Sequence, residues 1–339
     1  MKAYHLTAPG TTLDEGLRNL RRVEVPQPPA GPGEVLIRQR AGGLNYVDLL
    51  FVDGTYCPPT LPLIPVMDGV GEIVARADDV HDFEIGDRVM PHVLPDWIDG
   101  PTPDFADIRS RGFSVPGVLS DYAAVPARSL AKIPDHLSFA EAATFSTAGT
   151  TAWNAMRDGK VGVGSTVLIL GTGNVSLFAL LFARMLGARV LLTSSSGQRL
   201  SEGRALGAHD LINYRETPDW DVKVRALTDG RGVDLVVETV GEQTFARSVN
   251  ATAKEGMIAA AGWRSGTIVP VPINRVQQQR IHIIGGMIGS VSDFRSMMRA
   301  VGENGLRPKI AQIFDFDQAR DAYRAMSRNE TAGKIIITV

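Results

Sequence analysis

The stretch that decides the fold of this chain is Val167-Leu168-Ile169-Leu170-Gly171-Thr172-Gly173-Asn174-Val175-Ser176. Its leading apolar residues are typical of a short buried strand. Residues 175–186 are apolar on most faces of a helix, and Gly187 supplies a helix stop. The glycines in between permit a sharp turn. The stretch therefore predicts a strand, a tight loop and a helix in direct succession.

Strand and helix patterns alternate on either side of this unit. Ser138 and Glu141 form a capping box that begins a helix before it. Alternation of this kind indicates a parallel sheet covered by helices on both faces, so the predicted fold class is α/β. Strands are predicted at 189–193, 210–214, 234–238, 257–261 and 281–284, and a further helix at 198–206.

The first third of the chain has a different character, because proline is concentrated there. Sixteen of the 20 prolines lie at or before Pro134. Proline interrupts helices and avoids central strands, so this region is predicted to hold short strands and loops. Alternating residues at 34–38 and 71–75 support strands. The tail, 317–339, is predicted to be one helix and a last strand at 335–337.

The composition of the chain argues against several classes of function. Of the 339 residues, 44% are hydrophobic and 21% are charged, which permits a sizeable core. Lys and Arg number 35 against 37 Asp and Glu, so there is no basic field for nucleic acid or anionic lipid. The single cysteine, Cys57, excludes an internal disulfide. With no signal-peptide pattern and no apolar stretch of membrane-spanning length, a cytoplasmic protein is expected.

The glycine loop predicts a dinucleotide site. Gly171 allows the tight turn, and Gly173 lets the backbone approach a pyrophosphate that lies on the helix N-terminus. Ser176 stands where a third glycine is usual, and it is small enough for close helix–strand packing. Such a pattern is weak alone and strong inside a strand–loop–helix–strand unit. The alternative is an ordinary glycine turn in an α/β domain.

The end of the next strand predicts the type of dinucleotide. Ser194, Ser195 and Ser196 stand where an acidic residue would bind the ribose of NAD. Without a carboxylate a 2′-phosphate is not repelled, and Arg199 lies one helical turn further on to pair with it. NADP(H) is therefore favoured over NAD(H). In the alternative, Arg199 is a solvated surface charge.

Further motifs follow one another along the chain: GLNYVD at 43–48, DGTY at 53–56, PVMDGVGE at 65–72, GDRV at 86–89, AAT at 142–144, TAW at 151–153 and AGKI at 332–335. Together with the glycine loop, these motifs resemble the medium-chain dehydrogenase/reductase superfamily. The resemblance is to its zinc-free quinone-oxidoreductase-like branch, whose members include proteins described as alcohol dehydrogenases. It covers essentially the whole chain.

The resemblance implies a division of the chain and an assembly. A GroES-like β-barrel catalytic domain is expected at 1–128 and a Rossmann domain, with its doubly wound parallel sheet, at 129–295. The C-terminal segment, 296–339, is expected to return to the first domain. A homodimer is also implied, built by joining sheets across the Rossmann domains of two copies.

The zinc sites of the superfamily are not matched in this chain. Zinc members hold a catalytic ion with Cys, His and Cys, and the matching positions here are Asn45, Met67 and Thr147. Asn and Thr are poor zinc ligands, and the Met thioether suits copper(I). Zinc members also have a His–Glu pair, and in this chain only its acidic position is matched, by Asp68. Their structural lobe with four cysteines is missing as well. We therefore expect no metal site.

Without a strong Lewis acid to stabilise an alkoxide, conjugate reduction demands less of the protein than alcohol oxidation does. Hydride from NADPH would reach the β-carbon of an enone or enal, or a quinone, while a hydrogen-bond donor stabilises the negative charge. The resemblance assigns Asn45 to hydrogen bonding with substrate or ribose. Asp48 would orient its neighbours or relay a proton, and Tyr56 would donate to the carbonyl. In the alternatives, these residues are a turn residue, a helix cap and a half-buried aromatic.

The same matching implies further cofactor contacts. Asn174 and Val175 are expected to offer backbone N–H groups to the pyrophosphate, and Thr151 a hydroxyl. Tyr214 is expected to cover the adenine. Turn geometry alone would account for these residues in the alternative. The remaining contacts are expected at later strand ends and near the nicotinamide: Val240, Gly241, Gly262, Gly286 and Met287.

Three functions therefore compete. The first is an NADPH-dependent, zinc-independent reductase of quinones or α,β-unsaturated carbonyls. The second is a zinc-free alcohol dehydrogenase or ketone reductase, and the two differ in their rates with an enone and with a saturated alcohol. The third is a protein that holds NADPH without turnover. The partners expected of either enzyme are small carbonyl or quinone molecules, with no nucleic acid and no membrane.

Overall fold

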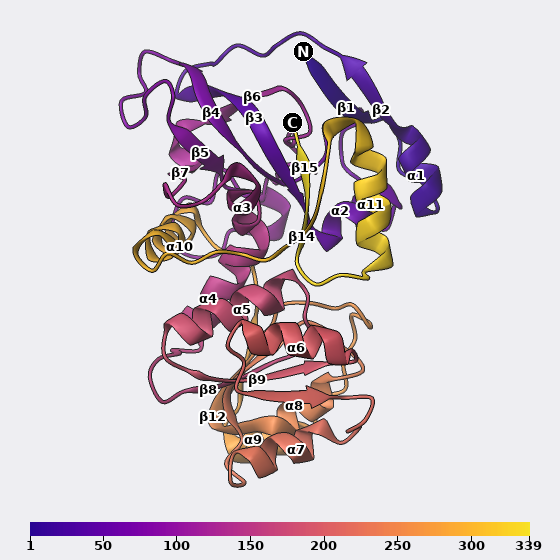
Figure 1. Ribbon diagram of the computed structural model, residues 1–339, viewed down its shortest axis with the longest axis vertical. Coiled ribbons are helices and arrows are strands. Elements are labelled where there is room, and N and C mark those ends of the chain that lie inside the picture. Colours follow the sequence, from indigo (N-terminus) through magenta and orange to yellow (C-terminus); the bar gives the residue numbers. More distant parts are fainter. The chain divides into compact units, whose positions relative to one another are not determined.

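The computed structural model describes residues 1–339, apart from the side chain of Phe105. The chain divides into two compact units, each visible in Figure 1. The first unit combines Met1–Thr150 with Gly289–Val339, and the second is Thr151–Ile288. Within the part of the chain that the structure describes, no helix has the length and apolar character needed to cross a bilayer.

The second unit contains a six-stranded sheet in which every pairing is parallel. Its strands are β8 (Thr166–Ile169), β9 (Arg189–Ser194), β10 (Asp210–Asn213), β11 (Val233–Glu238), β12 (Thr252–Ala260) and β13 (His282–Gly285). The order β10-β9-β8-β11-β12-β13 runs outward in both directions from the neighbours β8 and β11. This doubly wound order confirms the predicted α/β class. The helices are α4 (Thr150–Asp158), α5 (Asn174–Met185), α6 (Gly197–Ala205), α7 (Trp220–Leu227), α8 (Phe245–Ala251) and α9 (Ile273–Gln279).

Apolar runs of the sequence explain this sheet. Every residue of β8 is buried, as expected for a strand covered on both faces. The helix α5 begins and ends within one residue of its predicted bounds, and Gly187 follows it with φ +79°. Leu168 of β8 and Val236 of β11 share a core cluster with Trp220 of α7. The local pattern is therefore sufficient to specify these elements.

The first unit is organised around β3 (Glu34–Leu44), the centre of a seven-stranded sheet. β3 pairs in antiparallel fashion with β15 (Lys334–Thr338), β4 (Asp68–Arg76) and β6 (Tyr122–Pro126). The sheet is completed by β5 (Arg88–Pro91), β7 (Leu130–Lys132) and β14 (Ile310–Phe314), and β1 (Lys2–Leu6) and β2 (Leu20–Glu24) form a separate two-stranded sheet. The helices are α1 (Leu13–Asn19), α2 (Tyr46–Val52), α3 (Phe139–Ala142), α10 (Val291–Glu303) and α11 (Ala319–Arg328), with short helical turns at Phe105–Asp107, Ala127–Ser129, Phe145–Gly149 and Phe316–Gln318.

The C-terminal segment joins the first unit, because β15 pairs with β3 and α11 packs in the same core. The unit boundaries lie after Thr150 and after Ile288, away from the positions 128/129 and 295/296 expected from the sequence. Two contacts explain the difference. Ser146 Oγ accepts from the Val93 N–H at 2.9 Å, and the Val291 N–H donates to the Trp97 carbonyl at 2.8 Å. Both tie flanking residues to the first unit.

Candidate active site

The residues predicted to bind the cofactor gather at one edge of the parallel sheet. β9 ends at Ser194, and β10 ends directly before Tyr214. Gly241, Gly262 and Gly286 closely follow the ends of β11, β12 and β13. The carboxyl ends of parallel strands lie along a single edge, and ligands of doubly wound sheets bind there, beside the point where the strand order reverses. The topology therefore supports a dinucleotide site at this edge.

The glycine loop leaves room for a phosphate group. Gly171 has φ +72°, a left-handed conformation that favours glycine, and its N–H donates to Thr193 Oγ1 at 3.2 Å. Gly173 is the N-cap of α5, and a Cβ placed on it would meet no atom within 4 Å. Asn174 and Val175 form the first turn of α5, where N–H groups have no partner inside the helix. These features fit a pyrophosphate at the start of α5.

Two side chains hold this loop against the sheet. The Ser176 hydroxyl donates to the Leu170 carbonyl at 2.8 Å and is 1% exposed, so a small polar residue replaces the third glycine without loss of packing. Thr193, in β9, accepts from Gly171. Sequence reasoning missed Thr193, because nothing local marks a strand residue as the partner of a loop that lies far from it along the chain.

The serines after β9 are ordered by the backbone. Ser194 Oγ accepts from the Ser196 N–H at 3.3 Å, and Ser196 Oγ accepts from the Arg199 N–H at 3.4 Å as the N-cap of α6. A hydroxyl that accepts still has its own proton to donate. Tyr214 lies beside Ser194, because its N–H donates to the Ser194 carbonyl at 3.1 Å, and the residue is 42% exposed. Ser195 lies between the two ordered serines and is half-buried.

A fully buried carboxylate, Glu238, organises the loop after β11. Its Oε1 accepts from the Val240 N–H at 2.8 Å and from the Gly241 N–H at 3.1 Å. The Ser248 hydroxyl donates to the other oxygen at 2.5 Å. Because the N–H and carbonyl groups of both residues already form hydrogen bonds within the protein, Val240 and Gly241 would meet a cofactor through carbon atoms. Nothing in the local sequence distinguishes Glu238 from an ordinary surface acid.

The last strand ends are shaped by close backbone contacts. A Cβ on Gly262 would lie 2.4 Å from the Thr239 carbonyl oxygen. The Gly286 N–H donates to the Ala260 carbonyl at 2.8 Å, and Met287 follows it with a half-buried side chain. Thr151 stands apart from this edge in the sequence, in the first turn of α4, and is 5% exposed.

The first unit buries a cluster of charged and polar side chains, which we call the Lys334 cluster: Lys334, Asp68, Asn45 and Thr147. Lys334 Nζ donates to Asp68 Oδ2 at 2.9 Å and to Asn45 Oδ1 at 2.5 Å. Thr147 Oγ1 donates to Asp68 Oδ1 at 2.5 Å. The side chains of Lys334 and Asp68 are each 1% exposed. Of the positions matched to zinc ligands, Asn45 therefore binds a lysine that sequence reasoning had not assigned, and Thr147 binds the carboxylate partner of that lysine.

Asp48 lies next to this cluster and accepts hydrogen bonds from two backbone N–H groups. Asp48 Oδ2 accepts from the Asn45 N–H at 2.7 Å, and Oδ1 accepts from the Met67 N–H at 3.3 Å. Burial raises the pKa of the Asp48 carboxyl to about 7, an effect reinforced by the charge of Asp68 and opposed by both backbone bonds and Lys334. Asp48 is therefore a helix cap that binds the backbone of Asn45 and Met67, and its role in the reaction stays a prediction.

Tyr56 is not joined to the Lys334 cluster by any bond. It lies in the loop after α2, is 39% exposed, and its N–H donates to the Leu50 carbonyl at 2.9 Å. Among the residues that the structure describes, none forms a hydrogen bond with the Tyr56 hydroxyl. Its neighbour Cys57 is an exposed thiol whose Sγ donates to the Gly54 carbonyl at 3.6 Å. The donor role of Tyr56 therefore stays a prediction.

The donor set of the Lys334 cluster does not fit a zinc ion. Within the described residues, no three His, Cys, Asp or Glu side chains gather as a metal site. The ammonium of Lys334 lies between Asn45 and Asp68, where it would repel a second cation. Met67, at the remaining matching position, offers only a thioether. The site is thus built around a cation that belongs to the chain itself.

Comparisons with known proteins agree with this architecture. Residues 31–135 match the family described as an alcohol dehydrogenase GroES-like domain, and residues 175–303 match that described as a zinc-binding dehydrogenase. A zinc-type alcohol dehydrogenase-like protein of Schizosaccharomyces pombe is 38% identical over 324 residues, which cover 93% of each chain. The chain belongs to the medium-chain dehydrogenase/reductase superfamily.

Other members of the superfamily are similar over nearly their whole length. A quinone oxidoreductase of Pseudomonas aeruginosa is 27% identical, and the match covers 91% of each chain. The crystal structure of a putative alcohol dehydrogenase from Sinorhizobium meliloti has a TM-score of 0.91 and 32% identity, covering 100% of this chain and 99% of that one. The protein is accordingly an NAD(P)H-dependent oxidoreductase with a GroES-like domain and a Rossmann-like sheet.

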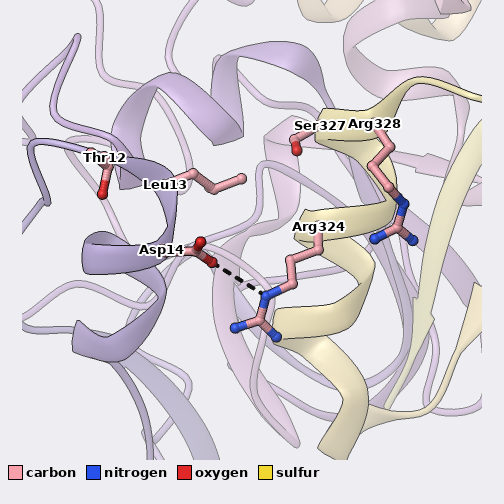
Figure 2. A pocket seen from close by; sticks show the side chains of 6 residues that line it. All are labelled: Thr12, Leu13, Asp14, Arg324, Ser327 and Arg328. Atoms are coloured by element: carbon pink, nitrogen blue, oxygen red, sulfur yellow. Dashed lines mark hydrogen bonds and ion pairs between the residues drawn. The ribbon is translucent and has the colours of Figure 1, made fainter.

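A surface pocket of about 450 Å³ in the first unit shares no lining residue with the Lys334 cluster. Figure 2 shows Arg324 of α11 pointing toward Asp14 of α1, and their charged atoms are 3.4 Å apart. Arg328 pairs with Glu330 at 3.6 Å. Because both arginines have carboxylate partners, we assign no ligand to the pocket. Its lining residues are Thr12, Leu13, Asp14, Arg324, Ser327 and Arg328.

Proposed function

We propose that this protein is an NADPH-dependent, zinc-independent reductase of quinones or α,β-unsaturated carbonyl compounds. The observation that carries the proposal is the ammonium of Lys334, which lies between Asn45 and Asp68. A fixed single charge polarises an oxygen atom less strongly than Zn²⁺ does. It is therefore better suited to a reaction whose negative charge spreads over an enolate or a quinol than to one that forms a localised alkoxide.

The residues of the chain divide the work of this reaction. NADPH, when bound, supplies the hydride that the β-carbon of the enone or the quinone accepts. The start of α5 receives the pyrophosphate, with Gly173 keeping side-chain atoms away from it. Asn45 presents an amide donor to the substrate oxygen, and Asp48 keeps that amide in place through the Asn45 backbone. A proton from solvent completes the saturated carbonyl compound or the quinol.

The preference for NADPH rests on the end of β9. Ser194, Ser195 and Ser196 replace the acidic residue that would bind a ribose hydroxyl and repel a phosphate. The Arg199 guanidinium lies on the first turn of α6, directly after these serines, and a guanidinium pairs well with a phosphate group. Each of these features favours a phosphorylated ribose over an unphosphorylated one.

A panel of substrates tests the proposed reaction. Rates of NADPH oxidation should be compared for 2-cyclohexenone, 1,4-benzoquinone and cyclohexanone, and the rate of NADP⁺ reduction should be measured with cyclohexanol. The proposal expects turnover of the enone or the quinone and little of the other two. The similarity to alcohol dehydrogenases favours the competing function, which would show the reverse order. Tight NADPH binding without oxidation by any compound would indicate the non-catalytic alternative.

We also propose that two copies of the chain pair through β13. Among the strands that the structure describes, β13 is the last of its sheet and pairs only with β12. Its Ile283 is 44% exposed, and Ile273 of the neighbouring α9 is 70% exposed. An uncovered edge with apolar side chains is a template for a further strand. A second copy related by a two-fold axis would extend the sheet and cover these residues.

A further inference from the structure

In the side-chain amide of Asn45 the oxygen accepts a hydrogen bond, whereas the nitrogen has no acceptor among the described residues. Its Oδ1 accepts from Lys334 Nζ at 2.5 Å. Its Nδ2 is buried, and no acceptor for it is found among the residues that the structure describes. The residue as a whole is 5% exposed. A buried donor without an acceptor is rare in folded proteins, because it loses its bonds to water and gains none in exchange.

Lys334 determines which end of this amide is occupied. An ammonium group only donates hydrogen bonds, so it must face the oxygen of Asn45 and never the nitrogen. With Oδ1 held, the two protons of Nδ2 are directed away from Lys334. Removal of the ammonium would allow the amide to turn by half a rotation, since its two ends have nearly the same shape.

Asp68 in turn determines where the ammonium lies. Its Oδ2 accepts from Lys334 at 2.9 Å, and its Oδ1 accepts from Thr147 at 2.5 Å, so both oxygens are fixed. The Lys334 and Asp68 side chains are each 1% exposed and neutralise one another in a site that excludes water. The hydrogen bonds therefore form one continuous series, in which Thr147 holds Asp68, Asp68 holds Lys334, and Lys334 holds Asn45.

We propose that Lys334 is a positioning residue of the active site: it turns the Asn45 amide so that Nδ2 donates to the substrate oxygen that becomes negative on hydride transfer. The inference rests on the proposed reductase function and extends it. The ligand that this donor recognises is a carbonyl or quinone oxygen. Such preorganised donors stabilise developing charge without rearrangement during the reaction.

The kinetic test uses a variant in which both buried charges are removed together. In Asp68→Asn/Lys334→Met the carboxylate is not left unpaired, which favours folding. We expect kcat for the active enone or quinone to fall about 100-fold or more, with the Kd for NADPH changed by less than about threefold. The single variant Lys334→Arg retains a donor-only cation beside Asp68, so its kcat should stay much closer to the wild-type value than that of the double variant. The matched control is Lys132→Met, which removes an exposed lysine paired with Asp87 at 2.8 Å in the same unit.

The outcomes separate this inference from the proposed function. Wild-type protein that reduces none of the enones and quinones would defeat the proposed function. Active wild-type protein with a folded double variant of unchanged kcat would defeat the role of Lys334 alone. A loss confined to the Kd for NADPH would assign the Asn45 donor to the cofactor ribose and would also overturn the inference.

A second measurement on the wild-type protein remains decisive if the double variant does not fold. The side-chain amide of Asn45 can be identified by ¹⁵N NMR as the pair of signals that is absent in Asn45→Asp. With NADP⁺ present, addition of cyclohexanone, the saturated analogue of the enone, should shift these signals because the carbonyl accepts from Nδ2. Signals that stay in place while cyclohexanone competitively inhibits enone reduction would contradict the proposal.

Discussion

Lys334 Nζ lies 2.9 Å from Asp68 Oδ2, although 266 positions separate the two residues in the chain. Both side chains are 1% exposed, so neither charge is relieved by water. The C-terminal strand β15 delivers the lysine by pairing with β3, while β4 begins at the aspartate on the other side of β3. The last strand of the chain therefore contributes directly to the candidate active site.

The buried ion pair makes the fold sensitive to loss of one partner. Lys334→Met leaves the Asp68 carboxylate buried with Thr147 as its remaining donor, and we expect the free energy of unfolding to fall by about 3–5 kcal/mol. Urea denaturation provides the measurement. Asp68→Asn/Lys334→Met should recover much of the loss, and Lys132→Met, at an exposed pair, should cost less than about 1 kcal/mol. Equal costs for the Lys334 and Lys132 variants would contradict the burial argument.

Metal analysis tests the absence of zinc directly. The Lys334 cluster offers an ammonium where zinc-dependent members bind an ion, so freshly purified protein should contain well below one zinc per chain by mass spectrometry. Treatment with a chelator should leave the reductase rate unchanged. A stoichiometric zinc ion bound through Asn45, Met67 or Thr147 would refute the proposed metal independence.

Arg199 is expected to select the phosphorylated cofactor. Arg199→Ala should raise the KM for NADPH roughly 10- to 150-fold, which corresponds to the loss of a charge-assisted hydrogen bond of about 1.5–3 kcal/mol. The KM for NADH should hardly change, because NADH lacks the 2′-phosphate. Arg204→Ala is a suitable control, since Arg204 lies on the same helix and its Nη1 donates to the His209 carbonyl. The same loss for NADPH and NADH would show that Arg199 does not read the phosphate.

The raised pKa of Asp48 predicts a pH dependence of stability. Burial raises this pKa from about 4 in an unfolded chain to about 7 in the folded protein. Between these values the native state binds more protons than the unfolded state, so the contribution of Asp48 to stability falls as pH rises. Asp48→Asn should reduce the decline in the urea midpoint between roughly pH 4 and pH 7. An identical pH profile in the wild-type protein and the variant would remove Asp48 as the cause.

The proposed assembly through β13 can be tested by one substitution that introduces a charged side chain into this strand. Ile283 is 44% exposed on this edge strand, and Ile283→Lys would place a cation in a sheet continued across two copies. Light scattering coupled to size exclusion should report a dimer for the wild-type protein and a monomer for the variant. Ile313→Lys, at a similarly exposed position of β14 in the first unit, should leave the dimer intact. A monomeric wild-type protein would exclude the proposed pairing.

The cofactor side of the protein was predictable in large part from short stretches of sequence. The strand ending at Ile169, the loop with Gly171 and Gly173, and the helix from Asn174 are consecutive, so local apolar periodicity and glycine placement specify them. The partners of this loop were not predictable. Thr193 and Glu238 resemble many other strand-terminal polar residues, and their roles depend on which strands become neighbours.

The sequence by itself determined the superfamily, the parallel sheet and the mismatch of Asn45, Met67 and Thr147 with zinc. The sheet follows from the alternation of strand and helix patterns, and the superfamily and the mismatch follow from the resemblance carried by motifs along the chain. Only the tertiary structure decided that Lys334 meets Asn45, 289 positions away, and that the amide nitrogen of Asn45 is left without an acceptor among the described residues. The physical reason is that hydrogen bonding and desolvation act over a few ångströms in space, and strand pairing alone brings these distant residues within that range.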